Sequence, residues 1–352
     1  MAVNTGLASL SEGLWTAATG TYMLAVVAYT GEYAFGRNGR IARTSADRTV
    51  QAGAVASRQP ALVGGGETAG ASDHLRPAEA SDQPPVEIDP VRQDGTAGRR
   101  WGRAAVGLTV LAALFHLASV AIRGIAVDRV PWGNMYEFTL VVGLMATVAW
   151  LATLVRMPQL RYLGLFVMMP VLLVMFLAGT LYTKASKLVP ALQSYWLAIH
   201  VSSVAVAEGI LLTSAAITAM YLVRARFERH AAAGTAPARF AALGSRLPAA
   251  AALDKAAYRT VAFAFPIYTA GVIFGAIWAE AAWGRYWGWD PKETWAFIAW
   301  VVYAMYLHAR ATAGWKGNRA AYINLLGFAA MTFNFFVVNI VISGLHSYAG
   351  LS

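Results

Sequence analysis

Two histidines occupy matching positions in the hydrophobicity pattern of this chain, and their chemistry is the clearest in the sequence. His200 lies in the first turn of an apolar segment at 196–223, and His346 lies at the end of another at 321–344. Imidazole is a strong axial ligand for haem iron. Either residue taken alone is better explained as an interfacial histidine that is hydrogen-bonded to a neighbour. Together, on two helices, they can hold a planar macrocycle from both faces.

A tryptophan-rich segment lies at the same depth as these histidines. Six of the twelve tryptophans fall between 278 and 300, and the run 283–290 reads Trp-Gly-Arg-Tyr-Trp-Gly-Trp-Asp. An interfacial aromatic belt would spread its tryptophans over all helix ends, whereas half of them gather here. The run therefore favours a surface for a large, flat, apolar ligand with a polar edge, formed by Trp283, Trp287 and Trp289. Asp290, Pro291 and Glu293 fit an N-cap, N1, N3 pattern, so Asp290 is a helix cap first and a ligand contact second.

The other histidines separate by position. His308 comes 18 residues after Asp290, about 27 Å along a helix, so it belongs to a second, inner site or is an interfacial residue beside Arg310. His116 fits a packed, hydrogen-bonded position in the core. His74 and His230 lie in polar segments and fit solvated positions.

Charged residues near the outer helix ends offer further ligand contacts. Buried acids are costly and therefore informative. Glu208 or Glu280 can orient a ligand histidine by accepting a hydrogen bond from the second ring N–H of that histidine. Either acid can equally complete a hydrogen-bond network inside the protein. The outer cations can pair with carboxylates on a ligand edge or bind lipid headgroups; they are Arg123, Arg129, Arg285 and Lys292.

The elements that carry these residues are long apolar segments. Hydrophobic residues make up 58% of the 352 residues and charged residues 13%, which excludes an ordinary soluble domain. We predict an all-α integral membrane protein with about eight transmembrane helices and an outer tryptophan-rich loop. The predicted segments are 14–35, 104–122, 136–155, 162–182, 196–223, 260–282, 294–309 and 321–344.

The basic residues predict the orientation of these segments. With the N-terminus outside, 22 of the 28 Lys and Arg fall in inner segments, which is the pattern that cytoplasmic loops show. We therefore predict an N-out, C-out topology, and the net charge of +10 needs no nucleic acid to explain it. The predicted organisation is a first helix at 1–35, a disordered inner linker at 36–103 and a membrane domain at 104–352. The chain contains no cysteine, so it has no thiol chemistry of its own.

At this point the residues resemble a known family. The run at 283–290 resembles the WWD domain of haem-handling proteins in cytochrome c biogenesis. Three further features resemble the CcsA/ResC (System II) branch, often labelled CcsB in actinobacteria: the run Trp132-Gly-Asn-Met-Tyr-Glu137-Phe, the element that ends at His308, and the terminal Gly-Leu-His346-Ser-Tyr. The resemblance covers roughly residues 104–352 and includes the WWD loop at 283–295.

The resemblance implies a function. His200 and His346 match the outer axial ligands of haem b. His308 matches one ligand of an inner haem site, whose second ligand comes from a ResB/Ccs1-type membrane partner. Within this chain, His116 is the candidate for that second ligand. The family presents haem to the Cys-x-x-Cys-His motif of apocytochrome c, moves haem outward, and forms part of a holocytochrome c synthase. No residue of this chain is predicted to be catalytic, and its other partners are membrane lipids, not nucleic acid.

Three alternatives compete with this interpretation. One is a System I WWD protein similar to CcmC or CcmF, although eight segments and His308 argue against the first and the short chain against the second. Another is a transporter of some other amphipathic solute, for which paired broken helices would be expected; Pro170 and Pro266 are weak signals of that kind. The third is an assembly factor whose tryptophan loop is a docking surface.

Overall fold

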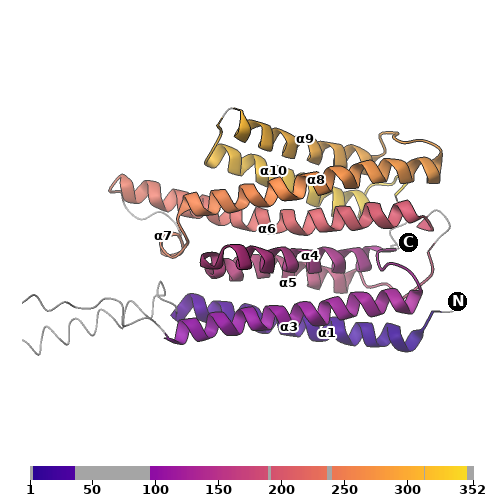
Figure 1. Cartoon of the computed structure of the whole chain (residues 1–352), viewed down its shortest axis with the longest axis horizontal. Coiled ribbons are helices and arrows are strands. Elements are labelled where there is room, and N and C mark those ends of the chain that lie inside the picture. The colour runs from indigo at the N-terminus through magenta and orange to yellow at the C-terminus, as the bar shows by residue number, and fades with distance from the viewer. Residues whose placement is uncertain (1–2, 36–95, 189–191, 236–239, 313, 347–352) are drawn as a thin grey trace, which may run out of the picture.

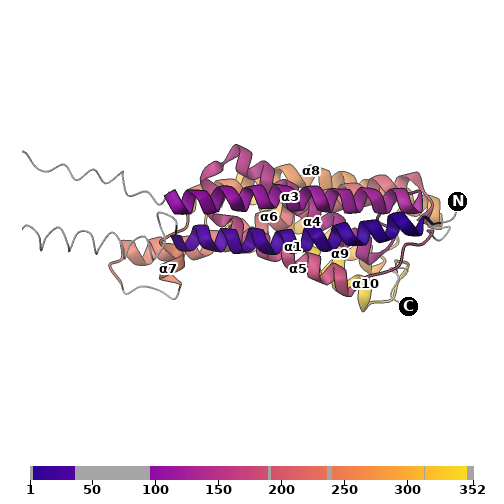
Figure 2. The ribbon, with the colours of Figure 1, turned by 90° about the horizontal axis from the view of Figure 1, so that it is seen from below.

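Eight long helices run along a common axis in the computed structural model (Figures 1 and 2). It describes residues 3–35, 96–188, 192–235, 240–312 and 314–346, and these residues contain no strand. The long helices are α1 (Thr5–Phe35), α3 (Thr96–Val127), α4 (Met135–Arg156), α5 (Gly164–Thr180), α6 (Tyr195–Ala232), α8 (Ala250–Trp283), α9 (Pro291–Ala311) and α10 (Asn318–Ile340). The short helices η1 (Pro158–Leu163) and α7 (Ala241–Gly244) lie in connections.

The all-helical prediction is confirmed, because each of the eight predicted segments falls on one of these helices. Six helical stretches in the described residues are long and apolar enough to cross a membrane: α3, α4, η1 with α5, α6, α8 and α10. In a bilayer a helix satisfies its own backbone hydrogen bonds, which is why apolar segments of this length fold this way. The helices α1 and α9 are not among the six, so a count of eight spans remains a prediction.

Two predicted boundaries are wrong. The predicted disordered linker includes residues 96–103, but α3 begins at Thr96. The first residues of this helix are polar, so the hydrophobicity pattern does not show where it starts. The rest of the linker, with His74, lies outside the described residues. The last helix ends at Ile340 rather than at 344. His346 therefore lies in the segment that follows α10, not on the helix.

The helices form four rows that lie side by side in Figure 1: α1 with α3, α4 with α5, α6 with α8, and α9 with α10. Close backbone approach joins the middle rows. A Cβ added at Gly209 of α6 would lie 2.5 Å from the backbone nitrogen of Ala146 in α4, so only glycine permits this contact. Buried side chains from both α4 and α6 belong to one large apolar core, which joins α4 to the helix that carries His200.

Local signals define the turn between α8 and α9. Helix α8 ends at Gly284, whose φ of 72° is the left-handed conformation that glycine adopts most easily. Trp289 has a φ of 58°, which is unusual for a bulky residue. The Glu293 carboxylate accepts hydrogen bonds from the N–H groups of Gly288 at 2.8 Å and Asp290 at 3.1 Å. These two bonds hold the backbone on both sides of Trp289.

Candidate functional site

The structure brings His200 and His346 to the same indole ring. The His200 ring stacks on Trp278 with a centroid distance of 6.3 Å and an interplanar angle of 9°. The His346 ring meets Trp278 edge to face at 5.8 Å and also contacts Trp283 at 5.0 Å. Residues from α6, from the end of α8 and from the segment after α10 therefore meet at one place. Trp278 had not been predicted as a site residue, although it begins the cluster of six tryptophans.

The hydrogen bonds of both histidines fix which ring nitrogen holds the proton. His200 Nδ1 lies 2.7 Å from the Gly271 carbonyl oxygen, and His346 Nδ1 lies 2.8 Å from Asp290 Oδ2. A carbonyl and a carboxylate only accept, so each Nδ1 donates and each Nε2 carries the lone pair. This arrangement is the one that metal-ligating histidines commonly have. In each ring Nε2 is therefore the nitrogen that can accept a hydrogen bond or bind a metal ion.

The charge state of His346 agrees with a ligand role. Burial is the main cause that lowers its pKa, to about 4, and the positive charge of Lys292 acts in the same direction, while the bond to Asp290 opposes them. At neutral pH the imidazole is uncharged, so its contact with Asp290 is a hydrogen bond from a neutral ring rather than an ion pair. A neutral imidazole is the form that binds a metal.

Asp290 serves the helix and the histidine at once. The predicted N-cap pattern is confirmed: its side chain accepts from the Lys292 N–H, and Glu293 completes the capping box. The same carboxylate accepts from the Leu345 N–H at 2.8 Å and from His346 Nδ1 at 2.8 Å. Asp290 thus ties the start of α9 to the segment after α10 and orients the imidazole. Neither Glu208 nor Glu280 makes such a bond in the described residues, and Glu280 is exposed.

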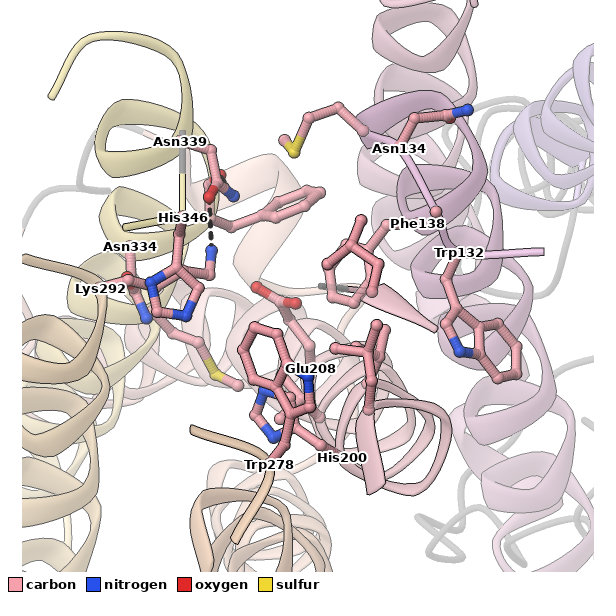
Figure 3. A pocket seen from close by; sticks show the side chains of 18 of the residues that line it. Trp132, Asn134, Phe138, His200, Glu208, Trp278, Lys292, Asn334, Asn339 and His346 are labelled. Atoms are coloured by element: carbon pink, nitrogen blue, oxygen red, sulfur yellow. Dashed lines mark hydrogen bonds between the residues drawn. The ribbon is translucent and has the colours of Figure 1, made fainter. Parts of the chain in front are cut away.

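A cavity of about 140 Å³ opens beside the two histidines (Figure 3). One side carries polar groups from α9 and α10: Lys292, Asn334 and Asn339. The opposite side is mostly apolar and comes from α4, α6 and the preceding loops. Its lining includes Trp132, Phe138, Leu192 and Leu197, and Trp278, Glu208 and Tyr268 complete the cavity.

A smaller cavity of about 80 Å³ is lined by the same two histidines and reaches the tryptophan loop. Trp283 and Trp287 line it, together with Tyr286 and Glu293. Trp289 lines neither of these two cavities: it is 64% exposed and packs against Trp287 and Phe297. Two of the three predicted loop tryptophans therefore face a cavity that both histidines share, and the third lies on the surface.

Most of the predicted outer cations are engaged by carboxylates. Arg123 and Arg129 both bond to Glu137, and Arg285 bonds to Glu293. Lys292 differs, because it lines both cavities and donates to Asn339 Oδ1 at 2.7 Å. Of the four cations, Lys292 is the one placed to meet a ligand in either cavity.

Glu137 is the centre of a buried ionic cluster that builds the apolar wall. Its carboxylate accepts from Arg123 at 3.1 Å, from Arg129 at 2.7 Å and from the Gly133 N–H at 2.9 Å. Asn134 caps the start of α4 by accepting from the Glu137 N–H. The cluster fixes the turn that presents Trp132 to the cavity. The sequence motif around Trp132 had pointed to this turn without showing what holds it.

We expect Glu137→Gln to destabilise the protein strongly. Both the glutamate and Arg123 are fully buried, and removing one member of a buried ion pair typically costs about 3–5 kcal/mol. The matched control is Glu228→Gln, whose pair with Arg224 is partly exposed and should cost at most about 1 kcal/mol. Thermal unfolding of both variants in detergent measures the difference, and equal midpoints would contradict the structural role of the cluster.

The comparisons with known proteins place this geometry in a family. Residues 132–346 match the family described as cytochrome C assembly protein. The chain belongs to the cytochrome c assembly family. The match begins at Trp132 and ends at His346, so it contains both histidines and the tryptophan loop. It does not include α1 or α3.

Curated relatives of this chain in the cytochrome c assembly family are CcsA proteins, which confirms the resemblance found in the sequence. The CcsA protein of Guillardia theta is 37% identical over 264 residues, covering 70% of this chain and 85% of its own length. That of Porphyra purpurea is 32% identical over 291 residues, covering 70% and 89%. A solved structure of the cytochrome c haem lyase CcmF has the same fold, with a TM-score of 0.56 at 18% identity; the match covers 96% of this chain and 47% of that one.

The remaining predicted histidines of this family member lie elsewhere. His308 is exposed in the last turn of α9, at the opposite end of that helix from Asp290. His116 is fully buried between helices, 3.3 Å from the Tyr22 hydroxyl, which confirms the packed core position. His230 is partly exposed and bonds to the Thr235 hydroxyl. None of the three reaches the cavity that His200 and His346 share.

Proposed function

We propose that this protein binds haem b between His200 and His346 at the tryptophan loop and presents it for covalent attachment to apocytochrome c. The observation that carries the proposal is the pair of imidazoles whose Nδ1 atoms both donate, to Gly271 and Asp290, so that both Nε2 atoms can ligate iron. The cavity supports the fit, because it combines apolar and aromatic walls with the polar groups of Lys292, Asn334 and Asn339.

The attachment chemistry needs little from the chain itself. Each substrate thiol adds across a haem vinyl group: a C–S bond forms, the S–H proton passes to the neighbouring vinyl carbon, and no electrons are exchanged. Positioning and axial ligation are the contributions of the protein. Axial histidines leave the edge of the macrocycle open to the substrate. The histidine of Cys-x-x-Cys-His then replaces one of them, which releases the product.

We place this site on the outer face of a bacterial plasma membrane, in the N-out, C-out topology that the basic residues favour. The chain then acts with a ResB/Ccs1-type partner as part of a holocytochrome c synthase, and haem reaches the outer site from an inner one. The exposed position of His308 at the far end of α9 supports an inner ligand that shares its haem with the partner.

An absorption spectrum of the purified protein, oxidised and after dithionite, tests the proposal. We expect a sharp reduced Soret band with resolved α and β bands, as bis-histidine haem gives. These bands should disappear in the His200/His346 double alanine variant. A protein that holds no haem, with or without a ResB-type partner, would refute the proposal.

We expect His308→Ala to lower the haem content of the complex with the partner while the outer site still binds. Haem content should fall because the proposed inner site loses a ligand. The outer site should still bind because His308 lies too far from the cavity to affect it directly. Haem per complex, measured by pyridine haemochrome, should fall for His308→Ala and not for the control His230→Ala. An unchanged haem content would make His308 an ordinary interfacial residue.

A further inference from the structure

The main cavity has two unlike walls, which lie on opposite sides of the cavity in Figure 3. On the α9 and α10 side, Lys292 Nζ donates to Asn339, and the buried side-chain oxygen of Asn334 has no hydrogen-bond partner among the described residues. On the α4 and α6 side, Trp132 and Phe138 stand with two leucines. A ligand that enters this cavity meets the ammonium group and two amides on one side and mostly apolar surface on the other, where Asn134 and Glu208 are the polar exceptions.

Haem has the same asymmetry, with two carboxylates on one edge and vinyl groups on the opposite part of the ring. A carboxylate gains a charge-assisted hydrogen bond from an ammonium group and pays a large desolvation cost against apolar side chains. The favourable orientation places the carboxylate edge on Lys292 and the amides. The vinyl groups then face Trp132.

A second cavity begins behind that apolar wall. It is open, has a volume of about 510 Å³, and lies between the loop at 127–133 and the start of α6. It shares four lining residues with the first cavity: Trp132, Gly133, Leu192 and Leu197. The two cavities therefore adjoin each other at the wall that the vinyl groups would face.

The boundary between the cavities offers a hydrogen-bond donor. The indole N–H of Trp132 is buried and has no partner among the described residues, which is uncommon for a buried polar group. A peptide carbonyl in the second cavity would satisfy it once the side chains that cover the indole N–H move aside. Glu137 holds the turn in place through Arg129 and Gly133, so the donor has a fixed position.

We infer that the second cavity is the entry for the apocytochrome segment that carries the two thiols and the histidine. The thiols then reach the vinyl groups from the Trp132 side, rather than past Trp283 and Trp287. This inference rests on the proposed function, because it assumes that haem is bound between His200 and His346. It adds the orientation of the macrocycle and the side from which the substrate polypeptide arrives.

Disulfide trapping can test the side of entry, because the chain has no cysteine of its own. Ser194→Cys and Ala198→Cys place a thiol in the second cavity. Tyr286→Cys is the matched control, since Tyr286 lines the cavity beside the tryptophan loop and is 61% exposed. Each haem-loaded variant, with its partner, is mixed with a Cys-x-x-Cys-His peptide under a mild oxidant. We expect mass spectrometry to show the peptide linked at 194 or 198 and absent at 286.

A maleimide reaction first establishes that all three thiols are accessible, so a missing disulfide is informative. Trapping at 286 alone, equal trapping at all three positions, or no trapping in accessible, haem-loaded protein would each overturn the inference. The Soret band of the same samples separates this failure from a failure of the proposed function. If the band is absent, haem binding itself is wrong; if it is present, only the side of entry is wrong.

Discussion

Replacing either outer histidine by alanine should abolish holocytochrome c formation. His200 reaches the cavity from α6 and His346 from the segment after α10, and each supplies one Nε2. Losing one leaves an open axial position on the iron, so the macrocycle is held less tightly and at the wrong angle to the substrate. Haem staining of a co-expressed cytochrome c measures the loss. The control is His230→Ala, because His230 lies on the polar end of α6 and bonds only locally to Thr235.

Exogenous imidazole distinguishes a ligand role from a packing role in these variants. It can fill the open axial position, so cytochrome c formation should recover partly for His200→Ala and His346→Ala. An imidazole in solution cannot restore a packing defect. Normal haem-stained cytochrome c in both variants without imidazole would show that neither residue is an axial ligand.

Asp290→Ala should lower haem affinity about 10- to 100-fold, the usual effect of removing the group that orients a metal-ligating histidine. It should also destabilise the protein by about 1 kcal/mol, because an N-cap is lost. Both effects come from one carboxylate, which bonds to His346, Leu345 and Lys292. Haem titration and thermal unfolding of the same preparation measure the two effects separately.

Asp290→Ser separates the cap from the orientation of the histidine. Serine is a good N-cap, but its side chain is shorter by one carbon and has one oxygen, so it cannot cap α9 and also hold His346 and Leu345. We expect this variant to unfold like the wild type and to bind haem as weakly as Asp290→Ala. Wild-type affinity in the serine variant would show that the contact between Asp290 and His346 has no part in binding.

Local sequence patterns were sufficient for the helices and for some of their ends. Apolar segments of bilayer length predict helices because the backbone must satisfy its own hydrogen bonds there, and all eight segments are helical. The Asp290-Pro-x-Glu293 pattern predicted the start of α9 because capping uses residues only three positions apart. The polar start of α3 and the end of α10 carried no such signal, and both boundaries were misplaced.

The candidate ligands followed from residue type and depth alone: the positions of His200 and His346 relative to the tryptophan run were enough to select them. What orients them depended on the tertiary structure. His346 bonds to an aspartate 56 residues earlier, and His200 bonds to a backbone carbonyl 71 residues later. The sequence suggested Glu208 and Glu280 instead, since they are the acids nearest to His200 and to the loop.

The same limit applies to the walls of the cavity. Trp278, Asn334 and Asn339 resemble many other residues of apolar helices until the packing of α8 and α10 places them beside the histidines. Glu137 resembles an isolated acid until α3 brings Arg123 to it. The sequence by itself determined which segments are helices and which residue types can ligate iron, because both depend on local chemistry. Only the tertiary structure decided their partners and the shape of the cavity, because those contacts join residues far apart in the chain.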